Sequence, residues 1–315
     1  MSRRPDGPEG AKRIPPGRDP AARAASVLES ELAQPLEPGL YLVSTPIGNL
    51  ADITLRALGV LNRADLIVCE DTRHSRKLLS HYGIAGKLEA YHEHNAQRMR
   101  PKILERIRAG LAAALIADAG TPLISDPGFK LVREALEEGL NVVSVPGPSA
   151  PIAALTSSGL PSDRFFFEGF LPPKSAGRRK RLEAIAGLPG TVILFESGSR
   201  LAEALRDAAE VLGPRQGAVA KELTKRHETV LRGTLDELAL AIDAAGSEIT
   251  RGEFVLLIEQ GEGEEASDQV IAEHLESALA IMSLRDAARE VADELGVKRN
   301  RVYRLGLSLT GRDSP

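Results

Sequence analysis

The chain has 315 residues, enough for about two domains of roughly 100–200 residues each, and its hydrophobic content of 43% is ordinary for a globular protein. Its one cysteine, Cys69, excludes an intrachain disulfide, and no apolar run approaches the roughly 20 residues of a membrane span, so we expect a cytoplasmic protein with no membrane partner. A net charge of −4 offers no general attraction for nucleic acid, so any nucleic-acid site must be local.

Residues 1–38 are rich in Pro, Gly, Arg and Ala and show no sustained hydrophobic period. Such a segment buries too little apolar surface to offset the entropy lost on ordering. We therefore predict a disordered N-terminal tail over 1–38, and RNA contact by its early arginines is the alternative role for it.

Residues 39–160 alternate short apolar runs with helical patterns, which favours a mainly parallel sheet flanked by helices. Polar or Gly/Pro-rich residues follow one strand after another, and open α/β sheets bind ligands at the carboxyl ends of their strands. The sequence therefore predicts a pocket built from these loops. The strands are expected at 40–44, 65–69, 88–92, 112–117 and 141–145.

The loop Asp118–Gly128 reads Asp-Ala-Gly-Thr-Pro-Leu-Ile-Ser-Asp-Pro-Gly and follows a buried apolar run. Gly120 permits close approach of the backbone to a bound molecule, and Pro122 fixes φ beside it. Asp126 is a candidate N-cap for a helix whose first residue is Pro127. A plain connection between a strand and a helix is the alternative interpretation.

Residues 161–262 read as a second, mixed α/β domain, with strands near 165–170, 191–196, 218–222, 228–232 and 253–259. A basic run without an acid extends from Lys174 to Arg181, and it can face phosphates. A solvated helix face is the alternative for this run.

Residues 270–311 form three helical patterns after an acidic, glycine-bearing linker. Ala292, Gly296 and Val302 occupy the small, turn and apolar positions of a helix-turn-helix. The basic residues of its second helix are Lys298, Arg299, Arg301 and Arg304. They could form a phosphate-facing surface, and a simple three-helix cap is the alternative interpretation.

Several chemistries lack their motifs. No phosphate-binding G-x-x-x-x-G-K-[ST] occurs, no G-x-G-x-x-G follows the first strand, and no G-x-S-x-G is present. His92-Glu93-His94 is a weak metal candidate because alternate residues of an extended segment point to opposite faces, so no metal is expected. The groups left to bind a ligand are the loop amides and scattered carboxylates. They permit a zwitterionic ligand with hydroxyls, such as S-adenosylmethionine, without requiring it. The carboxylates are Glu70, Asp71, Asp118 and Asp126.

A series of motifs resembles the ribosomal RNA small subunit methyltransferase I family, whose fold is the tetrapyrrole-methylase type. The similarity extends in order over about residues 39–310. Its segments are Leu42-Val-Ser-Thr-Pro-Ile-Gly-Asn-Leu-Ala-Asp-Ile-Thr-Leu-Arg-Ala-Leu58, Cys69-Glu-Asp-Thr-Arg-His74, Tyr91-His-Glu-His-Asn95, Asp118–Gly128, Val145-Pro-Gly-Pro-Ser-Ala150, Phe167-Glu-Gly-Phe-Leu-Pro172, Glu222-Leu-Thr-Lys225 and Gly252-Glu-Phe-Val255.

The resemblance implies two α/β domains with a small helical, helix-turn-helix-like extension. It also implies transfer of a methyl group from S-adenosylmethionine to a cytidine ribose 2′-hydroxyl of 16S rRNA, near the decoding site of the small ribosomal subunit, by a homodimer. The cofactor would be lined by motif residues of three loops, with residues around Glu196 and Lys221 closing over it. These loop residues are Thr45, Pro46, Gly48, Asn49, Asp118, Gly120, Thr121, Pro122, Ser149 and Ala150.

The reaction needs a base or an electrostatic partner for the 2′-hydroxyl, because a neutral hydroxyl is a poor nucleophile. Asp71, Glu70 and His92 are the candidates, since they end strands next to the expected pocket. The expected phosphate contacts are Arg73, Lys174, Arg178, Arg179, Lys180 and Arg181.

Two positions depart from the family pattern. The family usually reads Glu-Ser-Pro-His-Arg where this chain has Glu196-Ser-Gly-Ser-Arg200, and it usually has an acid where this chain has Ala96. The role of that histidine therefore does not transfer. A tetrapyrrole C-methyltransferase on the same fold and a DNA-binding regulator are the competing functions.

Overall fold

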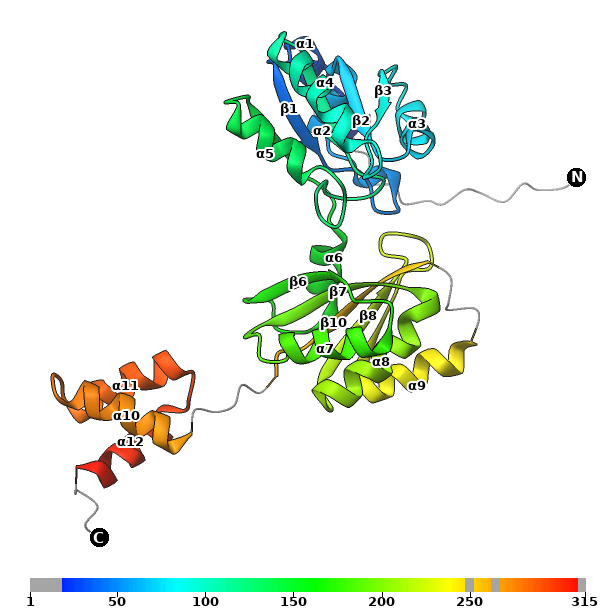
Figure 1. Cartoon of the computed structure of the whole chain (residues 1–315). Coiled ribbons are helices and arrows are strands. Elements are labelled where there is room, and N and C mark those ends of the chain that lie inside the picture. The colour runs from blue at the N-terminus through cyan, green and yellow to red at the C-terminus, as the bar shows by residue number, and fades with distance from the viewer. Residues whose placement is uncertain (1–18, 247–251, 262–266, 311–315) are drawn as a thin grey trace, which may run out of the picture. The chain divides into compact units, whose positions relative to one another are not determined.

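The computed structural model describes residues 19–246, 252–261 and 267–310. Its internal contacts divide the chain into two compact units, each containing one sheet with helices packed on it (Figure 1). The first unit runs up to Ser157 and also includes Ala220–Thr229, and the second comprises Ser158–Val219 and resumes at Val230.

The first unit contains a five-stranded sheet in the order β3-β2-β4-β1-β5, and the neighbouring strands pair in parallel. The central strand β4 is buried along its whole length, as its run of Ala, Leu and Ile predicts for a strand covered on both faces. The strands are β1 Gly39–Val43, β2 Leu66–Cys69, β3 Leu88–Ala90, β4 Ala112–Ile116 and β5 Val142–Val145.

Side chains that alternate along the strands enter two separate cores. Tyr41 and Val43 of β1 pack with α2 and α3 on one face, whereas Leu40 packs with α4 and α5 on the other. The helices of this unit are α2 Leu55–Arg63, α3 Thr72–His81, α4 Ala96–Arg108, α5 Phe129–Glu137 and α6 Ala150–Ser158, with a short 3₁₀ turn, η1, at Leu50–Asp52.

The strand order places a topological switch point at the adjacent ends of β1 and β4. The chain leaves β1 across one face through α2 toward β2, and it leaves β4 across the other face through α5 toward β5. Open α/β sheets bind ligands at such switch points. The topology therefore singles out the two loops after β1 and β4.

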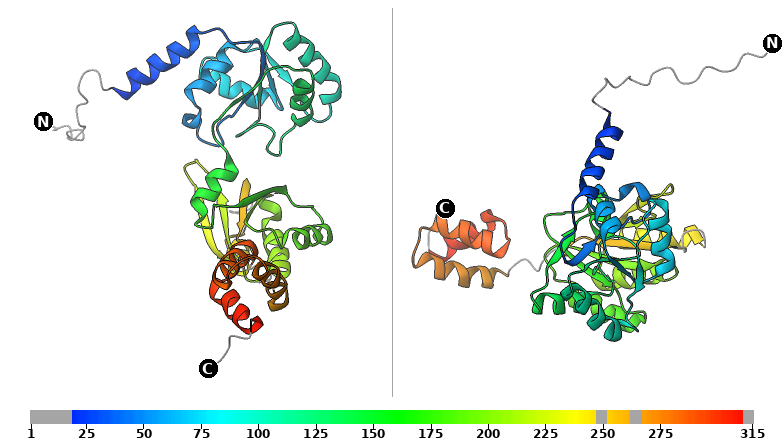
Figure 2. Two further views of the ribbon diagram at one scale, coloured as in Figure 1. Left: turned by 90° about the vertical axis from the view of Figure 1, so that its left-hand side faces the viewer. Right: turned by 90° about the horizontal axis from the view of Figure 1, so that it is seen from above.

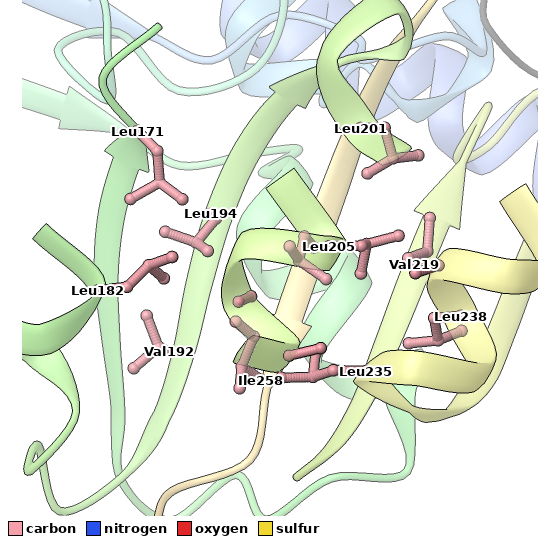
Figure 3. Close-up of a cluster of buried hydrophobic side chains, with 14 of the residues drawn as sticks. Leu171, Leu182, Val192, Leu194, Leu201, Leu205, Val219, Leu235, Leu238 and Ile258 are labelled. Atoms are coloured by element: carbon pink, nitrogen blue, oxygen red, sulfur yellow. The ribbon is translucent and has the colours of Figure 1, made fainter. Parts of the chain in front are cut away.

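The second unit contains a mixed sheet in the order β6-β7-β10-β8-β9, in which β7 pairs in parallel with β6 and antiparallel with β10. Aliphatic side chains from α7, α8 and α9 meet those of the sheet in one core (Figure 3). The elements are β6 Phe165–Phe170, β7 Thr191–Ser197, β8 Gln216–Lys221, β9 Thr229–Thr234, β10 Glu253–Ile258, α7 Ser175–Ile185, α8 Gly198–Leu212 and α9 Leu235–Ala245.

Three helices close the described chain: α10 Asp268–Leu279, α11 Leu284–Leu295 and α12 Arg299–Leu309. They have a hydrophobic core of their own, in which Ala292 and Val302 are buried, and Gly296 ends α11 in the left-handed conformation with φ of 64°. The predicted helix-turn-helix-like extension and the predicted α/β fold class are both confirmed.

The prediction of a disordered tail is wrong for α1, Pro20–Ala33, while residues 1–18 lie outside the described part. The Asp19 carboxylate accepts a hydrogen bond from the Ala21 amide and proline occupies the first turn, a combination that starts helices. α1 packs against α2 (Figure 2), where Arg63 pairs with Glu31. No residue of α1 is buried, so no hydrophobic period reveals it in the sequence.

Candidate functional site

The loops after β1 and β4 are joined directly by backbone hydrogen bonds. Thr45 and Gly120 exchange both amide-to-carbonyl hydrogen bonds, at 2.9 and 3.0 Å. The Thr45 hydroxyl also donates to the Ala117 carbonyl at 3.1 Å. Gly120 has φ of +79°, and a Cβ there would approach Cγ2 of Ile47 to 3.2 Å, so both conformation and space favour glycine.

The loop after β5 joins the same network through Thr121. The Thr121 hydroxyl donates to the Pro148 carbonyl at 3.0 Å and accepts from the Ser44 hydroxyl at 3.2 Å. Pro148 directly precedes Ser149, whose carbonyl accepts from Ala153 in the first turn of α6. The three loops expected to line the cofactor are thus held together at one edge of the sheet.

The loop after β2 is attached through Asp118. Its carboxylate accepts a hydrogen bond from the Asp71 amide at 3.2 Å. Asp71 in turn caps α3 by accepting from the Arg73 amide at 2.7 Å. Asp118 therefore positions Asp71 and its neighbour Glu70 relative to the loop Asp118–Gly128, here called the central loop.

Backbone strain is concentrated in two segments of the first unit. Within the described chain, the non-glycine residues with positive φ are Leu123 and Ser125 in the central loop and Glu222 and Thr224 in the segment after β8. Such conformations cost free energy and persist where the surroundings enforce them, often at functional sites. Both strained segments adjoin loops that the sequence predicts to bind cofactor.

The central loop continues further than the sequence predicts. The predicted N-cap Asp126 and first helical residue Pro127 are wrong, because α5 begins at Phe129 with Gly128 as its N-cap. Gly128 has φ of 141°, and a Cβ there would lie 2.6 Å from a Leu123 methyl carbon. The two residues Asp126 and Pro127 are thereby left in the loop, where they line a pocket.

This pocket lies at the carboxyl ends of β2, β3 and β4. It is lined by Glu70, Tyr91, Leu115, Ile116, Ala117, Pro122, Asp126 and Pro127. Burial raises the pKa of Tyr91, so its phenol stays protonated and can donate a hydrogen bond. The wall therefore combines apolar side chains with the carboxyl groups of Glu70 and Asp126, while the Tyr91 phenol is hydrogen-bonded with Arg100.

The three candidates for the base differ in environment. Burial raises the pKa of Glu70, and the Asp118 carboxylate raises it further, while His92 opposes the shift. The pKa of Asp71 is lowered, first by the Arg73 amide that it caps. Glu70 is solvent-exposed and lines the pocket, whereas the Asp71 carboxylate is engaged in capping α3.

His92 lies in the loop after β3, which ends at Ala90 rather than at the predicted residue 92. Asn95 fixes this loop, because its side chain accepts from the His92 amide and donates to the Ala90 carbonyl, both at 2.9 Å. The Nδ1 atom of His92 is buried, and it has no hydrogen-bond partner in the described part of the chain. Across the described residues, no group of three or more metal-ligating side chains is assembled.

A turn after β8 packs on the loop after β1, and the sequence reasoning missed this contact. The Asn49 amide donates to the Thr224 hydroxyl at 3.0 Å. A Cβ on Gly48 would lie 2.6 Å from Cγ of Lys225 and 2.8 Å from the Leu223 carbonyl oxygen. The sequence signal for this contact was the segment Glu222–Lys225, which resembles the family. Its residue types alone do not indicate what it contacts.

The basic run of α7 is mostly engaged within the protein. The prediction that Arg178 contacts RNA is wrong, because its side chain is 1% exposed and donates to Asp207 at 2.6 Å. Arg179 pairs with Asp207 and Glu210, and Arg181 pairs with Glu168. Lys174 and Lys180 are exposed and form no ion pair among the described residues. Acids distant in sequence neutralise most of this run, which the local pattern could not reveal.

The segment Glu196–Arg200, which departs from the family pattern, is also paired within the protein. The Glu196 carboxylate is buried, accepts from the Ser197 amide at 2.8 Å and pairs with Arg200 at 3.0 Å. Arg200 also donates to the Leu171 carbonyl at 2.7 Å. Glu196 therefore stabilises the loop after β6 through Arg200.

No described helix is long and apolar enough to span a membrane.

Comparison with known proteins identifies the family. The model of the family Tetrapyrrole (Corrin/Porphyrin) Methylases matches residues 39–239, and that of the RsmI C-terminal HTH domain matches 264–310. A uroporphyrin-III C-methyltransferase from Thermus thermophilus, solved with S-adenyl homocysteine, has a similar fold, with a TM-score of 0.50 and 21% identity over 71% of this chain and 97% of that chain.

Two relatives carry the same name, Ribosomal RNA small subunit methyltransferase I. The protein from Mesorhizobium japonicum is 51% identical over 88% of this chain and 94% of its own length. The protein from Pseudomonas aeruginosa is 47% identical over 87% of this chain and 98% of its own length. The chain belongs to the ribosomal RNA small subunit methyltransferase I family.

Proposed function

We propose that this protein transfers a methyl group from S-adenosylmethionine to the ribose 2′-hydroxyl of a cytidine in 16S rRNA, near the decoding site. The observation that carries the proposal is the joining of the loops after β1, β2, β4 and β5 at one sheet edge, in a chain whose relatives are named for this class of enzyme. Membership of the family supports the RNA substrate, and the loops support the methyl donor.

The residues present fit this cofactor. Gly120, at φ of +79°, fixes the loop after β4 against Thr45, and Thr121 and Asp118 tie that loop to its neighbours. The carboxylates of Glu70 and Asp126 suit amine and hydroxyl donors, and negative surroundings tolerate a sulfonium. When bound, the cofactor supplies a methyl carbon on a positively charged sulfur, open to in-line attack.

The protein would contribute positioning and proton acceptance. The hydrogen-bonded loops would hold the two reactants in one orientation. The translational entropy of bringing them together is then lost on binding and not in the reaction step. Glu70 is the group best placed to accept the 2′-hydroxyl proton, because its environment raises its pKa and it lines the pocket. Asp71 would serve to cap α3 and position Arg73.

The remaining assignments follow from the family and the surface. Lys174, Lys180 and Arg73 stay exposed and are proposed to contact phosphates of the small ribosomal subunit, together with the basic residues of α12. We propose a cytoplasmic homodimer, with domains at 39–160 and 161–262, a helical extension at 270–311, and a segment after β8 that belongs structurally to the first unit.

The tetrapyrrole C-methyltransferase alternative shares the fold but has no use for a C-terminal helix-turn-helix domain. One assay separates the alternatives. The protein is incubated with methyl-labelled S-adenosylmethionine and under-methylated small subunits or 16S rRNA, and the RNA is digested to nucleosides. Label in 2′-O-methylcytidine supports the proposal. Label transferred to a tetrapyrrole and none to RNA would overturn it, and tight duplex DNA binding without turnover would favour a regulator.

A further inference from the structure

The segment between β8 and β9 is a rigid turn rather than a loose hairpin loop. The Lys225 amide donates to the Glu222 carbonyl at 2.9 Å, and the Glu228 amide donates to the Lys225 carbonyl at 3.1 Å. Side chains reinforce it, since the Glu228 carboxylate accepts from the Thr224 amide and Lys225 pairs with Glu222 at 2.9 Å. These contacts hold the positive φ angles of Glu222 and Thr224.

The turn is fixed to the loop after β1. The Thr224 hydroxyl accepts from the Asn49 amide, and Gly48 leaves room for Lys225 and the Leu223 carbonyl where any side chain would collide. The buried side chain of Leu223 anchors the base of the turn. The tip of the turn is therefore held beside the candidate cofactor loop.

The tip carries exposed basic residues without acidic partners. Arg226 and His227 are exposed, and within the described residues neither forms an ion pair. Both carboxylates of the turn are already used, Glu222 by Lys225 and Glu228 by the Thr224 amide. The guanidinium of Arg226 is thus open to an anion, in contrast to Arg178, Arg179 and Arg181 of α7, which acids neutralise.

A second exposed basic group lies at the same edge of the first sheet. Arg73 and His74 open α3 directly after β2, and the Arg73 side chain is 92% exposed. β2 and β1 are separated in the sheet by β4, whose loop contains Asp118. Exposed basic residues therefore flank the central loop on both sides, along the carboxyl edge where the strands end.

We propose that the turn Glu222–Glu228 is an RNA-binding element, in which Arg226, assisted by His227, contacts backbone phosphates of the rRNA strand beside the target nucleotide. The inference rests on the proposed function, because it takes RNA as the substrate. The turn fixes the backbone of Arg226, so that only its side chain has to be ordered on a phosphate, and the guanidinium's fork of donors matches phosphate oxygens. The turn then fixes the strand relative to the cofactor loop on which it is packed.

The test compares the Arg226→Gln, Arg226→Lys and His227→Gln full-length variants with Arg164→Gln, which removes an exposed arginine at the start of β6. Affinity for 16S rRNA is measured over a range of salt concentrations, and affinity for S-adenosylhomocysteine is measured by calorimetry. The proposal expects Arg226→Gln to weaken RNA binding several-fold and to reduce the slope of log affinity against log salt by about 0.7–0.9.

Arg226→Lys should restore the slope because it keeps the charge, His227→Gln should weaken binding less, and Arg164→Gln should behave as wild type. Cofactor affinity should be unchanged in all four. Wild-type RNA affinity and slope in Arg226→Gln would overturn the inference, as would a parallel loss of cofactor affinity. Failure of the wild-type protein to methylate RNA would instead contradict the proposed function, and it is read in a separate assay.

Discussion

Single residues in the loops at the carboxyl ends of the strands act through backbone geometry as much as through side-chain chemistry. Gly120 and Gly48 are required by their surroundings for different reasons, one by a positive φ and the other by the turn packed against it. Asp118 and Thr121 each bridge two loops with one side chain. Substitutions here should affect binding before they affect folding.

Gly120→Ala should weaken S-adenosylhomocysteine binding at least tenfold, because a Cβ strains the loop and meets Ile47 within the site. Gly139→Ala is the matched control, since its φ of +71° imposes similar strain in open space. Calorimetry measures both affinities, and thermal unfolding measures both stabilities. Equal losses of affinity in the two variants would show that general destabilisation, not the site, is responsible.

Glu70 should govern the pH dependence of methyl transfer. Its pKa is raised by burial and by Asp118, and it accepts a proton only when ionised, so activity should fall as pH drops through this raised pKa. Glu70→Gln should lower kcat by about 10²–10⁴-fold and abolish this acidic limb. Asp71→Asn should leave the limb in place. An unchanged limb in Glu70→Gln assigns the base elsewhere.

At the level of elements, α7 and α8 are joined by a buried ion pair. Burial by itself would raise the pKa of Asp207, but hydrogen bonds from Arg178, Arg179 and Ser175 outweigh it and lower the pKa. The carboxylate therefore stabilises the fold above the ordinary aspartate pKa of about 3.9, and this contribution is lost as pH falls toward the lower folded value. The basic run is in this respect structural.

Arg178→Leu should lower the free energy of unfolding by about 3–5 kcal/mol at neutral pH, because it leaves the buried Asp207 without its main partner. Lys180→Leu, on the exposed side of the same helix, should change it by less than about 1 kcal/mol. Urea unfolding of the two variants checks the difference. The deficit of Arg178→Leu should shrink as pH falls below 4, and a constant deficit would contradict the ion-pair explanation.

At the scale of the whole molecule, the C-terminal helices are built separately from the loops of the first unit. The helices α10–α12 pack around their own hydrophobic core, and the loops proposed to hold the cofactor are joined within the first unit. A protein truncated after Gly261 should therefore keep its affinity for S-adenosylhomocysteine and bind 16S rRNA more weakly. Calorimetry and an RNA-binding titration test this pair of outcomes. Unchanged RNA affinity would restrict the contact surface to the α/β units.

The sequence by itself determined where the strands lie, that the first sheet is mainly parallel, and which loops follow its strands. Hydrophobic runs and Gly/Pro motifs are local signals, which is why they sufficed. It also determined the family, through motifs spread from Leu42 to Val255. It could not reveal α1, whose stability comes from a cap and from contact with α2 instead of a buried face.

Only the tertiary structure decided which charges are available. Arg178 and Arg226 look alike in sequence, each in a basic stretch, yet one is buried against Asp207 and the other is exposed on a rigid turn. The structure also placed Thr224 on Asn49, 175 residues away in the chain. Ion pairing and strain depend on partners distant in sequence, so local patterns predict where a site lies better than which residues serve it.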